Sequence, residues 1–155
     1  MTIEEALRNE RIGSLSLPRP ACVRPEATLG ETLAIMRREG VGAVLVCDGP
    51  RLVGIFTERD VLNKMFGAPV AESEPIERFM TRDPATLAPD NVLGDAVSLM
   101  TERGYRHIPL RQPAGERVGM IVARDIVHYI AEHFPAEVVN LPPGLVQEFT
   151  TPEGA

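Results

Sequence analysis

The stretch GIFTERD, residues 54–60, returns in altered form as GMIVARD at residues 119–125. A longer block upstream repeats as well, because RPACVRPEATLGETLAIMRREG (19–40) aligns with DPATLAPDNVLGDAVSLMTERG (83–104). The distance between the two copies of the shorter motif is one residue longer than the distance between the two copies of the upstream block. This difference predicts one insertion, which fits the loop RQPAGER at 111–117. Two copies of so long a period indicate a duplicated half-domain, since a solenoid needs at least three units.

Each copy predicts the same order of elements: a short extended segment, a helix, two strands and a second helix. Apolar residues recur at helical spacing over 29–39 and 93–103. Thr28 with Glu31 forms a capping box for the first of these helices, and Asp90 or Asn91 can cap the second. The expected strands are 42–47 with 51–57 and 106–110 with 117–122. The closing helices are expected within 57–67 and 123–134.

The two halves are expected to pack sheet against sheet in an α+β fold. A half of about 60 residues buries too little surface to be stable alone. Packing the two together gives a pseudo-two-fold body with two related clefts, which are common ligand positions. We expect repeats at 12–66 and 76–133, an N-terminal helix within 1–11 and a C-terminal arm at 134–155.

Composition excludes several classes of function. The net charge of −6 and the 5% aromatic content argue against a nucleic-acid partner. Only two cysteines occur, and neither a signal peptide nor a membrane-length apolar run is visible, so we expect a cytoplasmic protein. The three histidines lack the spacing of a zinc site. Because the sequence has no nucleophile elbow, Walker loop or dinucleotide-binding glycine motif, catalysis is not expected.

The duplicated order, with GIFTERD and GMIVARD leading into the last helices and GYRHIPL (104–110) in the second copy, resembles the tandem CBS-domain pair, or Bateman module. The resemblance covers roughly residues 12–133. It implies a stand-alone regulatory protein that binds an adenosine compound between the copies: AMP, ADP, ATP, S-adenosylmethionine or a dinucleotide. It also implies a homodimer, for which the helices at 29–39 and 93–103 offer apolar surface.

The first motif places suitable groups for a nucleotide where a strand ends and a helix begins. The free N–H groups of that helix would face an anion. Thr57 and Arg59 could bind phosphate, and the Asp60 carboxylate could accept both hydroxyls of a ribose. The alternative is a helix cap, with Thr57 as N-cap and Asp60 three residues later.

The second motif carries Arg124 and Asp125, but Val122 replaces the threonine. Val122 cannot cap through a side-chain oxygen. An acidic residue retained without that partner is easier to explain by a ribose, although a favourable interaction with the helix dipole is the alternative. We therefore predict ribose binding at both aspartates.

The two clefts should differ, because Arg106 and His107 stand where the first copy has Gly42 and Ala43. We expect them to reach phosphates; an exposed strand end with solvated charges is the alternative. The adenine would lie in an apolar slot made by the extended segments and the middle strands. The expected slot residues are Cys22, Val23, Val44, Thr86, Ile108 and Pro109, which would also belong to the core. A different class of function, a ligand-free dimeric adaptor, remains open on this sequence.

Overall fold

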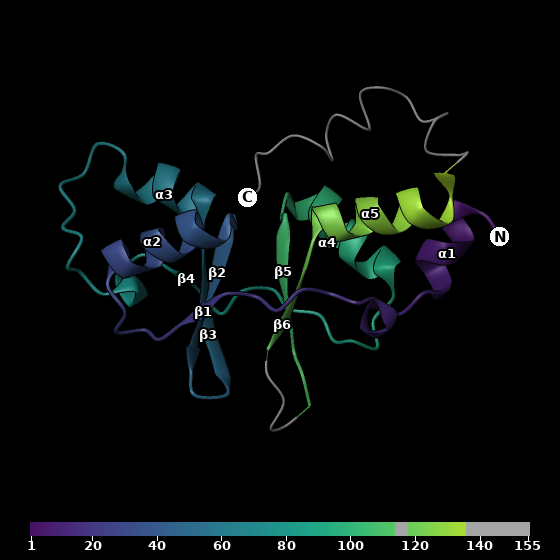
Figure 1. The fold of residues 1–155 in the computed structure, drawn as a ribbon, viewed down its shortest axis with the longest axis horizontal. Coiled ribbons are helices and arrows are strands. Elements are labelled where there is room, and N and C mark those ends of the chain that lie inside the picture. The colour runs from purple at the N-terminus through teal and green to yellow at the C-terminus, as the bar shows by residue number, and fades with distance from the viewer. Residues whose placement is uncertain (114–117, 136–155) are drawn as a thin grey trace.

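The computed structural model describes residues 1–113 and 118–135. It confirms the α+β class and the duplicated order of elements (Figure 1). The first copy contains β1 (Cys22–Val23), α2 (Leu29–Glu39), β2 (Ala43–Asp48), β3 (Arg51–Thr57) and α3 (Glu58–Met65). The second contains α4 (Leu93–Arg103), β5 (His107–Leu110), β6 (Gly119–Val122) and α5 (Ala123–His133). Outside this pattern lie α1 (Ile3–Asn9), β4 (Thr81–Arg82) and the 3-10 turns η1 (Ile12–Ser14) and η2 (Ile76–Arg78).

The first sheet has the strand order β1-β2-β3-β4, and the second is the hairpin β5-β6. β1 runs parallel to β2, and the other pairs are antiparallel. In the second copy, Leu87 makes an isolated parallel bridge to Leu110. This bridge occupies the place that β1 has in the first copy, as expected from the short extended segment that opens each copy.

Helix capping follows the sequence in the first copy and departs from it in the second. The Glu31 N–H donates to the Thr28 hydroxyl at 3.1 Å, and the Thr28 N–H donates back to the Glu31 carboxylate at 3.0 Å. The prediction that Asp90 or Asn91 caps α4 is wrong, because Val92 is the N-cap. The Val92 N–H donates to the Asp95 carboxylate at 3.1 Å, so an acid in the first turn replaces the capping hydroxyl.

The two sheets face each other at the centre of the molecule, with α2 and α3 on one outer side and α4 and α5 on the other (Figure 1). Ala43, Leu45, Ile55 and Met120 form a buried apolar cluster between the sheets. Each copy also has a core of its own beneath its helices. The expected sheet-to-sheet packing is therefore present, and it brings the start of β2 close to β5 and β6.

The 3-10 turn that begins each repeat, η1 or η2, completes the core of the other copy. Ile12 is fully buried in the core of the second copy, and the Ile12 N–H donates to the Asn91 carbonyl at 2.8 Å. Ile76, the counterpart of Ile12 in the repeat, is fully buried in the core of the first copy, and the Ile76 N–H donates to the Ala27 carbonyl at 2.7 Å. Accordingly α1 lies beside α4, far from the first copy (Figure 1). The exchange ties the halves together.

A fourth strand is present in the first sheet but has no counterpart among the described residues of the second. β4 pairs with β3 through Gly54↔Arg82 and Ile55↔Thr81. A β-carbon on Gly54 would lie 2.9 Å from the Thr81 carbonyl oxygen, which accounts for the glycine at the start of GIFTERD. The alignment of the repeats places Leu17 and Pro18 opposite β4. Because proline has no N–H to donate, this segment is unsuited to pair with β6.

No helix in the described part of the chain is long and apolar enough to cross a membrane. Among those residues there is also no group of three or more His, Cys, Asp or Glu side chains that could hold a metal ion. Most of the expected C-terminal arm, and residues 114–117 of the insertion loop, lie outside the described residues.

Candidate functional site: a cavity between the two copies

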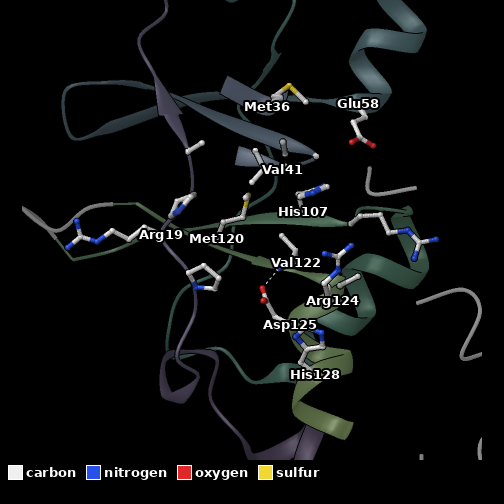
Figure 2. Close-up of a pocket in the computed structure, with 18 of the residues that line it drawn as sticks. Arg19, Met36, Val41, Glu58, His107, Met120, Val122, Arg124, Asp125 and His128 are labelled. Atoms are coloured by element: carbon white, nitrogen blue, oxygen red, sulfur yellow. Dashed lines mark hydrogen bonds between the residues drawn. The ribbon is translucent and has the colours of Figure 1, made fainter. Parts of the chain in front are cut away.

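A cavity of about 610 Å³ lies where the two copies meet, a volume within the range of small-molecule sites. Its walls come from the segment 18–21, the C-terminal end of α2, the start of β2, and β5, β6 and α5 of the second copy (Figure 2). The apolar part of the lining consists mainly of Ala21, Met36, Val41, Met120 and Val122. The polar part includes Arg106, His107, Arg124 and Asp125, four of the residues predicted from the sequence.

Asp125 lies in the first turn of α5 with one carboxylate oxygen engaged. The Val122 N–H donates to its Oδ2 at 2.8 Å, and no described residue makes a hydrogen bond to Oδ1 (Figure 2). Desolvation raises the pKa of this half-buried carboxyl, against the Val122 hydrogen bond and the positive charges of His128 and Arg124. Asp125 can therefore still accept a hydrogen bond from a ligand.

The hydrogen bond to Val122 corrects one step of the sequence interpretation. An acidic side chain in the first turn accepts the N–H of the N-cap residue whatever side chain that residue carries. Asp125 therefore stabilises the start of α5 although Val122 has no hydroxyl. Its presence without a threonine does not by itself favour a ribose.

Both carboxylate oxygens of Asp60, the counterpart of Asp125, already have partners within the protein. The Thr57 N–H donates to Asp60 Oδ2 at 2.9 Å, and the Thr81 hydroxyl donates to Oδ1 at 3.1 Å. The Lys64 ammonium lies 3.0 Å from the same Oδ1. With only 6% of its surface exposed, Asp60 is part of the folded framework. This geometry supports the helix-cap interpretation at Asp60 rather than the ribose interpretation.

His107 points from β5 toward the first copy, near Val41 and Glu58 (Figure 2). Its Nδ1 is buried and has no hydrogen-bond partner among the described residues. Burial lowers the pKa of the imidazole to about 4, so the ring is neutral at pH 7. The sequence suggested a basic group for phosphate; here His107 offers a neutral imidazole instead.

Positive charge in the cavity comes from arginines. Arg106 and Arg124 were expected, whereas Arg19 and Arg37 were missed because they lie outside GIFTERD, GMIVARD and GYRHIPL, in the upstream block of the repeat. Among the described residues of the lining, four arginines stand against two carboxylates, Glu58 and Asp125, which is a formal excess of two positive charges. This excess is local, because the whole chain carries a net charge of −6. The cavity suits an anionic ligand.

The other predicted site residues do not line this cavity. Val44, Ile108 and Pro109 are fully buried, and Val23 is buried in the core of the first copy. Cys22 is exposed on β1, and the Thr86 hydroxyl accepts from Arg111 Nε at 2.9 Å. Arg59 reaches across to the second copy, where it donates to the Gly104 carbonyl at 3.2 Å. Thr57 bonds to Asp60, as described above.

Comparison with known proteins agrees with the fold. Residues 12–67 and 76–132 each match the family model of the CBS domain. The chain is 30% identical over 106 residues to inosine-5'-monophosphate dehydrogenase of Korarchaeum cryptofilum; the match covers 68% of this chain and 21% of that enzyme. It therefore corresponds to about a fifth of the enzyme's length.

Two solved structures have similar folds. An uncharacterized conserved protein from Pyrococcus horikoshii matches with a TM-score of 0.70 and 25% identity, over 79% of this chain and 92% of that one. The CBS domain protein PAE2072 from Pyrobaculum aerophilum, complexed with AMP, matches with a TM-score of 0.68 and 22% identity, over 79% and 98%. Both family matches lie on the two halves described above, and together they span most of the sequence. The chain thus belongs to the CBS domain family, as a tandem pair of CBS domains.

Proposed function

We propose that this tandem pair is a regulatory module that binds an adenosine nucleotide of the AMP, ADP or ATP class in the Asp125 cavity. The observation that carries the proposal is the Asp125 carboxylate, which keeps an oxygen without a hydrogen-bond partner among the described residues, beside Arg124 in an arginine-rich cavity. A ribose supplies hydroxyl donors for such an oxygen, and a phosphate supplies negative charge for the arginines.

In the proposed arrangement, the ribose hydroxyls donate to Asp125 and the phosphates lie toward Arg106 and Arg124. The N-terminus of α5 adds the favourable end of a helix dipole for the phosphates. The base packs among the apolar side chains Met36, Val41 and Met120, in place of the buried slot residues expected from the sequence. The AMP complex of the Pyrobaculum aerophilum protein supports this class of ligand, although its likeness to this chain is one of fold.

Occupancy of the cavity would report nucleotide levels to a partner. The ligand would touch both copies at once, because the lining includes Met36 and Val41 from the first and Arg124 and Asp125 from the second. Binding energy would therefore depend on how the copies sit against each other, and a partner that senses this arrangement would sense the ligand. We infer no catalytic step from this site.

Calorimetric titration with AMP, ADP, ATP and S-adenosylmethionine tests the proposal. At least one of the three nucleotides should bind, and Asp125→Asn should weaken it by tenfold or more, the loss of a hydrogen bond to a charged group. A nucleotide at 100 times its Kd should also raise the free energy of unfolding by about 2.7 kcal/mol. If none of the nucleotides binds, the module would instead be the ligand-free adaptor.

A further inference from the structure

We infer that Lys64 and Thr81 decide which of the two related clefts can take a nucleotide. They occupy the carboxylate of Asp60, so the chain binds a single nucleotide, at Asp125. This inference rests on the proposed function, because it concerns the same kind of ligand at the pseudo-symmetric position.

Lys64 and Thr81 supply Asp60 with the kinds of contact that a ribose would otherwise make. Thr81 donates a hydroxyl to Oδ1 at 3.1 Å, and the Lys64 ammonium lies 3.0 Å from the same oxygen. Lys64 is itself held in place, because its Nζ donates to the Phe79 carbonyl at 2.7 Å. A ribose would have to displace both groups from a carboxylate that is almost fully buried, and leaving such a charge partly unpaired is costly.

The second copy has neither group at the equivalent positions. The alignment that places Asp125 opposite Asp60 also places Tyr129 opposite Lys64. Tyr129 is buried and stacks on His133, with ring centroids 4.3 Å apart, and it makes no hydrogen bond to Asp125. Asp125 therefore has no internal cation in the place of Lys64.

Thr81 reaches Asp60 because it lies on β4, which pairs with β3 directly before α3. The segment that the repeat aligns with β4 carries Leu17 and Pro18 and forms no strand. A leucine there has no hydroxyl to offer. The two copies thus differ at two positions, with Lys64 opposite Tyr129 and Thr81 opposite Leu17. These differences leave Asp60 with both carboxylate oxygens engaged and Asp125 with one oxygen available.

The test is to remove the two internal groups and count the sites. Lys64→Ala with Thr81→Ala removes the ammonium and the hydroxyl and leaves room for a ribose beside the Asp60 carboxylate. Calorimetric titration with AMP and with ATP should give one site per chain in the wild type and two in this double variant. Adding Asp125→Asn to the double variant should leave one site, at Asp60, and a further Asp60→Asn should remove it. Lys64→Arg is the matched control and should keep one site.

A folded double variant that still binds one nucleotide would overturn the inference, as would two sites in the wild type. Should the double variant fail to fold, Asp60→Asn alone remains decisive. It should leave the number of sites unchanged and the Kd within twofold of the wild type, and a tenfold weaker Kd would overturn the inference. A wild type that binds neither AMP nor ATP would instead contradict the proposed function, on which the inference depends.

Discussion

His107 of the second copy packs against Gly42 of the first, where a β-carbon added to Gly42 would lie 3.2 Å from His107 Nε2. A carboxylate oxygen of Glu58 lies 3.4 Å from the same point, so the three residues converge at the junction of the copies. The imidazole is neutral here because burial lowers its pKa from 6.5 to about 4. The junction should therefore respond to acid.

We predict that the free energy of unfolding falls as the pH falls from about 6.5 toward 4. In this window the unfolded chain protonates His107 whereas the folded chain does not, so the unfolded state binds more protons. The loss from this residue should be about 2 to 3 kcal/mol at pH 4.5. Asp125 partly offsets this loss of stability toward the acidic end of the pH range, because its pKa is raised in the folded state. Urea denaturation at pH 7 and pH 4.5 measures the change.

His107→Gln is the control for this titration, because glutamine carries no charge at either pH. The variant should lose less stability than the wild type between pH 7 and pH 4.5, by about the same 2 to 3 kcal/mol. Equal losses in the two proteins would show that His107 is not the responsible group.

Replacing the two aspartates should affect folding unequally. Asp60→Asn should lower the free energy of unfolding by about 2 to 3 kcal/mol, because it removes a buried carboxylate charge that is paired with the more exposed Lys64 and weakens a capping box. Asp125→Asn should cost about 1 kcal/mol or less, since it weakens one capping hydrogen bond. Chemical denaturation without ligand distinguishes the two, and equal losses would contradict the different roles assigned to them.

The fold was predictable because its signals are local and occur twice. Two of the helices, α2 and α4, follow from apolar spacing, and each is followed by a glycine, Gly40 or Gly104, in the left-handed conformation. Only one of the two side chains that contact Asp60 Oδ1 could be predicted from the sequence. Lys64 lies one turn along the same helix, which a sequence shows, whereas Thr81 comes from the separate strand β4, which it does not.

The lining of the cavity was harder to predict for a different reason. Residues 43–46 of β2 are all buried, because one face of the strand packs on the helices and the other on the second sheet. Alternation along such a strand cannot tell which side chains face a cavity, so Val44 was assigned to a slot although it lies in the core. Arg19 and Arg37 reach the site only through the packing of the two copies.

Arg37 should strengthen nucleotide binding, whereas its neighbour Arg38 should not. Arg37 lines the cavity, and Arg38 is exposed on the same turn of α2 without lining it. Arg37→Gln should weaken ATP binding about fivefold, equivalent to about 1 kcal/mol for a solvent-exposed charge pair, and more at low salt. Arg38→Gln is the matched control and should stay within twofold. Equal effects would indicate a general charge effect and no local contact.

A homodimer remains a prediction, but two of the large exposed apolar side chains of the described residues lie at α3, and none lies on the helices at 29–39 and 93–103 that the sequence indicated. Leu62 on α3 is 70% exposed, and Phe66, the residue that follows the end of α3, is 89% exposed. Large exposed side chains close together are common at interfaces. Light scattering at micromolar concentration should give the mass of a dimer, and Leu62→Glu with Phe66→Glu should give that of a monomer. A wild-type monomer, or a variant that stays dimeric, would contradict this assignment of the interface.

A crystal structure of the chain grown with AMP or ATP tests nucleotide binding at Asp125 most directly. We predict one nucleotide per chain, with its ribose hydroxyls within hydrogen-bond distance of Asp125 Oδ1 and its phosphates toward Arg106 and Arg124. Asp60 should keep its contacts with Lys64 and Thr81. A nucleotide bound at Asp60, or a cavity at Asp125 that stays empty at saturating nucleotide, would show that Asp125 is not the single binding site.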